Sequence, residues 1–312
     1  MAKSAPTDAI VEGVLWMTVS ALTVAVLSAM AKFLEDTQSS QMLFFQMAVS
    51  TMVFGAFLLR QGRQALKTNH IILHLVRGLI VFGAWYVDFV AIDDIPLMDA
   101  ALLSNSVPLW APLIAWAWLR QRPPLPLWGG ILLGTAGVVL VLQSSRGPEV
   151  QLTAAVGQQT VIGGTLLALL SGILGAVGFV AVGILGRTDS ALLMAFSSSL
   201  IATVAATPYA LREWQTPDPL SMAVLIGIGL VFAAGSYAST LAVRQAPAAI
   251  VTPVCYASVV FTMLIDLVFW NDPPDAMGLM GAALVIVGGT LAIVIGQRRP
   301  PATPSSASLT AA

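Results

Sequence analysis

Ten long runs of apolar residues, separated by short polar connections, limit what this chain can fold into more than any other feature. A helix needs about 20 apolar residues to cross a bilayer, where lipid offers no hydrogen-bond partner to unpaired backbone groups. We therefore predict an all-α integral membrane protein with ten transmembrane helices. They are expected at residues 11–33, 42–59, 73–92, 97–119, 127–142, 161–185, 191–210, 220–242, 247–270 and 277–295.

Composition supports this class and excludes several others. Of the 312 residues, 57% are hydrophobic and 9% are charged, which is too apolar for a water-soluble domain. The formal net charge of −1 gives no reason to expect a nucleic-acid partner. Cys255 is the one cysteine, so no internal disulfide or thiolate metal cage can form. We expect no metal, no cofactor and no catalytic residues.

Lys and Arg are distributed unevenly over the connections, and in membrane proteins the cytoplasmic connections carry the excess. Ten are at the N-terminus or after even-numbered runs: Lys3, Arg60, Arg63, Lys67, Arg120, Arg122, Arg187, Arg244, Arg298 and Arg299. Three are on the other side: Lys32, Arg146 and Arg212. Arg77 is set aside, because it stands at the start of the third run. The excess predicts that both termini are cytoplasmic.

The sequence repeats itself after 151 residues, the difference between Gly13 and Gly164. The same shift superposes Leu15 on Leu166, Ser20 on Ser171, Leu34 on Leu185, Tyr86 on Tyr237, Pro96 on Pro247, Pro123 on Pro274, Gly130 on Gly281, Gly137 on Gly288 and Leu140 on Leu291. Matching prolines, serines and tyrosines indicate a duplication, since shared Gly and Leu alone would be weak evidence in so apolar a chain.

Five helices in each copy is an odd number, so the second copy enters the membrane from the opposite side. We expect a cytoplasmic segment at 1–10, a first five-helix repeat at 11–146, a second, inverted repeat at 160–297, and a disordered cytoplasmic tail at 298–312. Inverted repeats are typical of secondary transporters, in which two similar halves move around a site near the midplane.

The repeated residues also carry a family resemblance. The first copy has Pro96, small residues over 99–106, Pro108, Pro112, a turn at 120–124, Gly130 and Gly137; these recur as Pro247, Pro253, a turn at 271–274, Gly281 and Gly288. The pattern resembles the drug/metabolite transporter superfamily, specifically its EamA-type ten-helix exporters, which include amino-acid exporters. Members often carry Glu in the turns after the fourth and ninth helices, where this chain has Gln121 and Asp272.

Polar residues at matching depths suggest a substrate site. Counting about 1.5 Å of rise per residue places Ser20, Asn105, Ser171 and Tyr256 near the midplane. Ser20 pairs with Ser171 under the shift, and Asn105 with Tyr256, which suits a cavity on a pseudo-two-fold axis. The alternative is that these groups bond to neighbouring helices or to their own backbone.

Aromatic residues could form the walls of such a cavity. Tyr86 and Tyr237 lie about two-thirds of the way along their helices by the same count of helical rise, one toward each face, and could be paired gates. The alternative is an aromatic belt at the membrane interface. Trp110 is a further wall candidate, with Trp16 and Trp85, although single tryptophans often anchor or pack.

Asp88 and Asp266 are the carboxylates well inside apolar runs, where a charge at the bilayer centre costs about 3 kcal/mol. Asp266 lies close enough to the outer end to contact water. Asp88 is deeper and is a candidate for a proton site or for contact with an amine. His70 and His74 are expected at a solvated interface, since two imidazoles without further ligands make a poor metal site.

Prolines should also shape the spans. Pro108, Pro112 and Pro253 each remove a helix hydrogen bond and are expected to kink the fourth and ninth helices.

The substrate class follows from which charges are missing. No Lys or Arg stands in the middle of a run, whereas a phosphorylated substrate would need such a buried positive charge. We predict a monomeric secondary transporter in a bacterial-type inner membrane that exports neutral or aromatic amino acids, with protons as a candidate coupling ion. The rivals are an exporter of cationic or aromatic drugs that uses Asp88 or aromatic faces, a channel, and a membrane-embedded enzyme. The sequence lacks the H-E-x-x-H, G-x-S-x-G and paired-aspartate motifs that an enzyme would suggest.

Overall fold

The computed structural model describes residues 7–34, 37–94, 103–120, 123–144, 158–186, 188–212, 214–271 and 274–298. The first half contains α1 (Thr7–Ala31), α2 (Ser39–Gln61), η1 (Arg63–Leu66), α3 (Ile71–Asp94), α5 (Val107–Leu119) and α6 (Leu125–Ser144). The second half contains α7 (Gln158–Leu185), α8 (Ala191–Arg212), α9 (Pro219–Gln245), α10 (Ala248–Val251), η3 (Thr252–Tyr256), α11 (Ala257–Trp270) and α12 (Ala276–Arg298). The predicted tail beyond Arg298, together with Gln121, Arg146, Arg187 and Asp272, lies outside the described residues.

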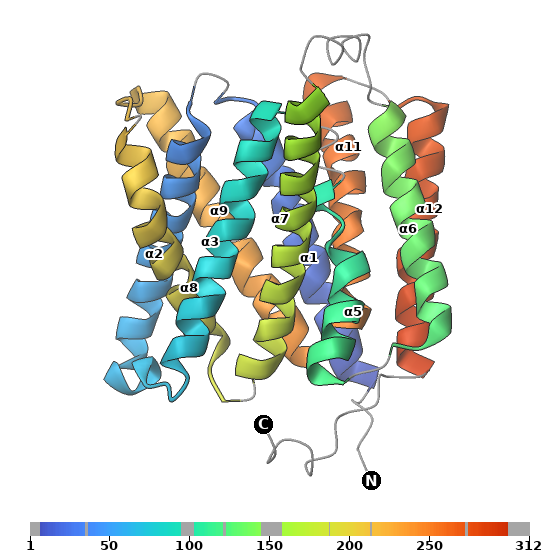
Figure 1. Cartoon of the computed structure of the whole chain (residues 1–312), viewed down its shortest axis with the longest axis horizontal. Helices are drawn as coiled ribbons and strands as arrows, with labels where there is room; N and C mark the ends of the chain where they lie inside the picture. Colours follow the sequence, from blue (N-terminus) through green and yellow to red (C-terminus); the bar gives the residue numbers. More distant parts are fainter. Residues whose placement is uncertain are drawn as a thin grey trace.

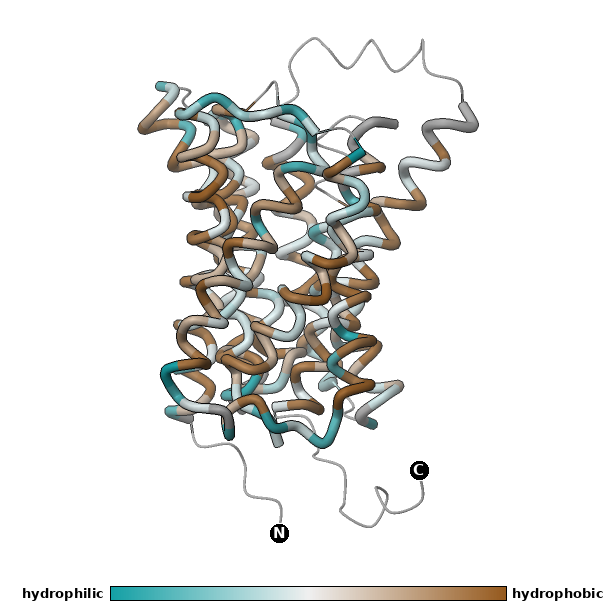
Figure 2. Tube along the Cα trace, turned by 90° about the vertical axis from the view of Figure 1, so that its left-hand side faces the viewer, coloured by the Kyte–Doolittle hydropathy of each residue, from teal (hydrophilic) through white to brown (hydrophobic). Residues whose placement is uncertain are grey.

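The predicted all-α membrane fold is confirmed. Eight helical stretches among the described residues are long and apolar enough to cross a membrane, and the shorter apolar helices Val107–Trp118 and Leu125–Val141 complete the expected ten. Figure 2 shows apolar residues along the length of the helices and hydrophilic residues gathered mainly in the connections at the two ends. Large apolar side chains such as Leu15 and Met52 are exposed on the outer surface, where lipid would cover them.

The spans predicted at 97–119 and 247–270, where prolines were expected to kink the helices, each contain an interruption of the α-helix. In the second half, α10 gives way to the 3-10 segment η3 around Pro253, whose missing N–H breaks the α-helical bonding. In the first half, residues 105 and 106 form a turn before α5 begins. Pro108 does not kink α5, because it stands in the first turn, where a helical N–H is not needed. Pro112 lies inside α5, which continues past it.

The two halves pack together as a two-fold axis in the membrane plane requires. The 151-residue shift places α1 on α7, α2 on α8, α3 on α9, α5 on α11 and α6 on α12. Equivalent contacts then occur twice: α1 packs on α9 as α7 packs on α3, and α2 packs on α9 as α8 packs on α3. The exchange of the two halves swaps α2 with α8 and α6 with α12, so each of these two contacts maps onto itself. The two pairs lie at opposite ends of the molecule (Figure 1). The axis therefore passes through both pairs, which confirms the inverted repeat.

The close contact between α6 and α12 depends on glycines, the same ones that the 151-residue shift superposes. A Cβ atom on Gly288 would lie 2.7 Å from the carbonyl oxygen of Gly130, and one on Gly281 would lie 2.6 Å from that of Gly137. Residue numbers rise along α6 as they fall along α12, so the two helices are antiparallel. Only glycine permits backbones to approach this closely in a membrane bundle.

We call the side at which α1 begins and α12 ends the terminal side; it lies at the bottom of Figure 1. Apolar side chains from the ends of several helices pack together there. This terminal-side cluster includes Ile10 of α1, Leu185 of α7, Met194 of α8, Ala246 after α9 and Val251 of α10. Each of these residues is at most 3% exposed, so the cluster is closed to solvent.

Candidate functional site

A carboxylate and two serine hydroxyls meet where α3, the segment before α5, and α7 come together. Asp88 of α3 accepts hydrogen bonds from the side chains of Ser104, directly before the turn at residues 105 and 106, and Ser171 of α7. Its Oδ1 atom is buried and has no hydrogen-bond partner among the described residues. A buried carboxylate oxygen without a partner is costly, so this Asp88 cluster (Asp88, Ser104 and Ser171) is suited to take up a proton or a cationic group.

The local packing explains why these side chains meet. α3 and α7 run antiparallel, with Gly178 against Val81 and Gly83 against Leu174, and this register brings Asp88 to Ser171. Small residues on both helices allow the close approach.

Gly172 brings the third residue to the cluster. A Cβ atom there would lie 2.8 Å from the carbonyl oxygen of Leu103 and 3.2 Å from that of Ser104. The turn before α5 can therefore rest on α7 only because residue 172 has no side chain. Trp110 fixes the other end of this turn, since its Nε1 donates to Ser106 Oγ at 3.0 Å.

Gly172→Ala is expected to lower the melting temperature of the protein in detergent, because the added methyl group must push the turn away from α7. Overpacking of this kind costs about 1–3 kcal/mol. Gly163→Ala is the matched control on the same helix, since a Cβ there meets nothing within 4 Å. Equal melting temperatures for the two variants would contradict the close contact.

Four of the eight residues predicted for the site gather here. Asp88 and Ser171 belong to the cluster, Asn105 follows Ser104 and begins the turn, and Trp110 bonds to that turn through Ser106. Ser104 itself was not predicted, and its place beside Asn105 was the only signal for it.

The equivalent place in the other half has no carboxylate. The 151-residue shift carries Asp88 to Ser239, Ser104 to Cys255 and Ser171 to Ser20. Ser239 donates to the Ser236 carbonyl, and Cys255 lies 3.4 Å from Met17 Sδ. Ser20 is 9% exposed on α1. The cluster is therefore a feature of one half only.

The three predicted tyrosines lie elsewhere. The Tyr86 ring packs on Tyr209 of α8 with centroids 4.6 Å apart, and Tyr237 packs on Phe54 of α2 at 6.4 Å. The two rings thus lie at equivalent interfaces, α3–α8 and α9–α2. Tyr256 is 2% exposed beneath α6 and α12. Its hydroxyl hydrogen-bonds Thr135 Oγ1 at 2.7 Å.

Asp266 lies at the opposite side of the molecule from the terminal side. It forms an ion pair with Lys32, whose Nζ also lies 4.4 Å from the centroid of the Trp270 ring. The two side chains are 45% and 25% exposed, so solvent screening leaves the pair little weight in stability.

A second polar cluster was missed. His74, predicted at a solvated interface, is 4% exposed, and Arg77, set aside as a residue at a helix end, is 6% exposed. Both point from α3 toward α8, and His74 also contacts Asp189, which is 6% exposed. Their spacing of three residues puts His74 and Arg77 on one helix face, and this was the available signal. No three described His, Cys, Asp or Glu residues come together as a metal site would require.

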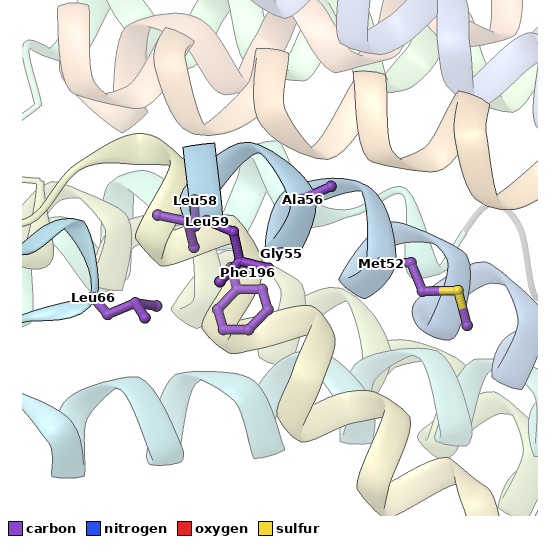
Figure 3. A pocket seen from close by; sticks show the side chains of 7 residues that line it. All are labelled: Met52, Gly55, Ala56, Leu58, Leu59, Leu66 and Phe196. Atoms are coloured by element: carbon purple, nitrogen blue, oxygen red, sulfur yellow. The ribbon is translucent and has the colours of Figure 1, made fainter. Parts of the chain in front are cut away.

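A groove of about 450 Å³ lies on α2, next to η1 and Phe196 of α8 (Figure 3). Its lining is apolar throughout: Met52, Gly55, Ala56, Leu58, Leu59, Leu66 and Phe196. Met52 and Leu59 are 72% and 74% exposed, so the groove opens on the surface that lipid would cover. It offers no polar group to orient a solute, and we do not assign it to the site.

Comparisons with known proteins agree with this geometry. A family model described as the EamA-like transporter family matches twice, over residues 11–143 and 162–294. The pseudopaline exporter of Pseudomonas aeruginosa is 28% identical, over 90% of this chain and 95% of that protein. The S-adenosylmethionine uptake transporter of Rickettsia prowazekii is 24% identical, over 92% and 94%. The riboflavin transporter of Vibrio cholerae is 26% identical, over 88% and 91%.

A solved crystal structure has the same fold. It superposes with a TM-score of 0.79 at 18% sequence identity, covering 92% of this chain and 98% of the other.

Proposed function

The chain belongs to the EamA-like transporter family, and from that premise we propose that it exports small metabolites, neutral or aromatic amino acids above all, by alternating access. Transport of a small molecule across a membrane, rather than enzymatic catalysis, already follows from the family and its relatives. The observation that carries the finer proposal is the Asp88 cluster, in which a buried carboxylate oxygen lacks a partner among the described residues.

An amino acid supplies what this cluster lacks. Its ammonium group is a cation with several N–H donors, and a charge-assisted hydrogen bond to Asp88 would be short and strong. The hydroxyls of Ser104 and Ser171 would orient the carboxylate for that contact. Trp110, held by Ser106, supports an aromatic wall for an apolar side chain.

Arg77 modifies the argument against phosphorylated substrates, because it is a buried positive charge within a span. Its Nη1 donates to the Met194 carbonyl at 2.8 Å and to the Ser198 hydroxyl. It precedes Asp88 by 11 residues, which is about 16 Å along α3. A carboxylate at the site, with the arginine engaged elsewhere, supports a zwitterionic or cationic solute over an anionic one.

An exporter of cationic or aromatic drugs is the second candidate, and the same carboxylate favours it. Any organic cation could pair with Asp88, and aromatic faces add cation–π attraction. Competition separates the two: amino acids should inhibit transport of a labelled amino acid more strongly than simple amines of equal size.

We assign the terminal side to the cytoplasm of a bacterial-type inner membrane. By sequence, ten Lys and Arg residues belong to the N-terminus and to the connections after even-numbered spans, against three in the other connections. Our proposal also includes that the chain acts as a monomer and that proton exchange drives transport. Relatives are named both as an exporter and as an uptake transporter, so the outward direction is part of our proposal.

Inside-out vesicles with a panel of labelled amino acids test these points. We expect saturable, proton-gradient-dependent uptake of neutral or aromatic amino acids, and exchange between unlike amino acids, which a channel would not give. Uptake of labelled amines without uptake of any amino acid would instead favour the drug exporter.

Tyr237→Ala is expected to impair this transport while the protein still inserts, if the ring lines the substrate path. Because Tyr237 also packs on Phe54, Tyr237→Phe is the informative partner variant. Transport rates equal to wild type in both variants would remove Tyr237 from the site. A lower melting temperature with normal transport would assign the ring to packing alone.

A further inference from the structure

The second polar cluster lies on the terminal side, at the start of α3 and the connection between α7 and α8. His74 Nε2 lies 2.9 Å from Asp189 Oδ2, and His74 Nδ1 lies 2.7 Å from Ser197 Oγ. Thr68 donates to the same Asp189 oxygen at 3.0 Å. The His74 and Asp189 side chains are each 5% exposed.

The other half of the chain provides an internal control for this cluster. The 151-residue shift carries His74 to Leu225, Arg77 to Ile228 and Asp189 to Gln38. Leu225 and Ile228 are buried in an apolar cluster with Leu34. On the opposite side the histidine and arginine positions are therefore hydrocarbon, and the Asp189 and Ser197 positions are the amides Gln38 and Gln46, so the fold itself does not require a buried histidine and carboxylate. A costly polar group that the architecture does not need points to a function.

The hydrogen bonds of this cluster can accommodate His74 in both protonation states. When His74 is neutral, Nε2–H donates to Asp189 and the Ser197 hydroxyl donates to Nδ1. When His74 is protonated, Nδ1–H donates to Ser197 Oγ, and the hydroxyl turns to the Met194 carbonyl, which lies 3.1 Å away. No hydrogen bond is lost in either state, so the site can hold or release a proton without leaving a buried group unpaired.

The charged groups around His74 act in opposite directions on its positive charge. Asp189, from the α7–α8 connection, contacts the imidazole directly and stabilises its positive charge. Arg77, on the same helix, opposes it, while the exposed His70 and Lys67 lie before α3 in solvent. Among the described residues, α8 contributes hydroxyls and a carbonyl here and no ionisable group.

This cluster is joined directly to the terminal-side cluster. The backbone N–H of Asp189 donates to the Leu185 carbonyl at 2.9 Å, and Met194 accepts from Arg77, Ser197 and Ser198. The side chains of Leu185 and Met194 are fully buried in the terminal-side cluster. Movement of the α7–α8 connection away from α3 would therefore move both apolar residues.

We propose that His74, Asp189 and Ser197 form a proton-binding site that holds the α7–α8 connection on α3 and so controls opening of the terminal side. This rests on the proposed alternating access. A proton on His74 converts the contact with Asp189 into an ion pair, which binds more strongly than the neutral hydrogen bond. The closed state thus binds the proton more tightly than the open state, so its stabilisation is present at low pH and is lost as the pH rises.

The first test uses the two histidines of the chain, one exposed and one buried. In lipid nanodiscs with ¹⁵N-histidine, His70→Gln assigns the His74 signal. We expect that signal to respond to pH. Asp189→Asn should alter the response of His74 and leave that of His70 unchanged. A His74 signal that does not change with pH would overturn the proposal.

The second test measures opening. Ala246, 3% exposed in the terminal-side cluster, is replaced by Cys in a Cys255→Ala background, and maleimide labelling is measured in inside-out vesicles. The labelling rate of this cysteine variant is divided by the labelling rate of the same variant that also carries His74→Gln. The division cancels the pH dependence of the thiol itself. We expect the ratio to rise about threefold as the pH is raised across the histidine range. A ratio that does not change with pH would contradict control by His74.

A folding control separates loss of the site from loss of the protein. The double variant His74→Leu, Asp189→Gln copies Leu225 and Gln38 of the other half, and we expect it to fold and to label without the pH response. Neither test needs a substrate, so they remain decisive if no amino acid is transported. Amino-acid transport with a pH-independent labelling ratio would overturn this inference and leave the proposed function intact.

Discussion

Asp88→Asn should reduce amino-acid uptake into inside-out vesicles by about 10- to 100-fold, which corresponds to loss of a hydrogen bond to a charged group. The amide keeps the size of the carboxylate and can still accept from Ser104 or Ser171, so the fold should persist. What it loses is the negative charge that an ammonium group or a proton would meet. Uptake of a labelled amino acid, normalised to the amount of inserted protein, measures the effect.

Asp266→Asn is the matched control, because Asp266 is the other carboxylate inside the apolar runs. Its partner Lys32 is 45% exposed, and an exposed ion pair contributes about 0–1 kcal/mol. Uptake should therefore remain close to wild type. If both variants transport equally well, the Asp88 cluster is not the substrate site, and the proposed role of its unpaired oxygen is wrong.

Gly288→Val should prevent stable assembly of the protein. A Cβ atom at Gly288 would lie 2.7 Å from the carbonyl oxygen of Gly130 and 2.9 Å from the Cα of Gly134. Both are backbone atoms of α6, so no side-chain rotation can relieve the clash and the helices must separate. We expect a cost of more than about 3 kcal/mol, above the usual range for overpacking. Yield of monodisperse protein and melting temperature in detergent measure it.

Gly289→Val tests the same substitution one residue further along α12. A Cβ atom there meets nothing within 4 Å, so the added side chain would face lipid. Its yield and melting temperature should match wild type. Similar behaviour of the two variants would show that the α6–α12 contact does not depend on glycine.

Much of the architecture could be predicted from the sequence, because lipid leaves a long apolar run no alternative to a helix. The presence of ten helical spans, the 151-residue repeat and the inversion of its second copy all followed from the order of residues in the chain. The helix interruptions did not follow. Pro253 marked one of them, but the turn at Asn105 and Ser106 contains no proline and depends on packing against Gly172 of α7.

The candidate site was predicted in part for the same reason. Depth along a helix can be counted, and this placed Asp88, Asn105 and Ser171 at suitable levels. The direction of a side chain around the helix depends on its neighbours, and the packing of Tyr86 on Tyr209 of α8 could not be counted from the sequence. His74 was expected at a solvated interface and Arg77 was set aside as a residue at a helix end, yet both are buried against α8, and His74 also against the α7–α8 connection.

The sequence by itself determined that this chain crosses the membrane ten times, in two copies of opposite direction, since those properties depend on hydrocarbon content and on an odd helix count. Only the tertiary structure decided which polar groups meet. Asp88 reaches Ser104 and Ser171, and His74 reaches Asp189, across 16, 83 and 115 residues of chain respectively. Such contacts depend on helix register and on backbone approach at glycines, and an apolar span can rotate about its axis without any change in its hydropathy.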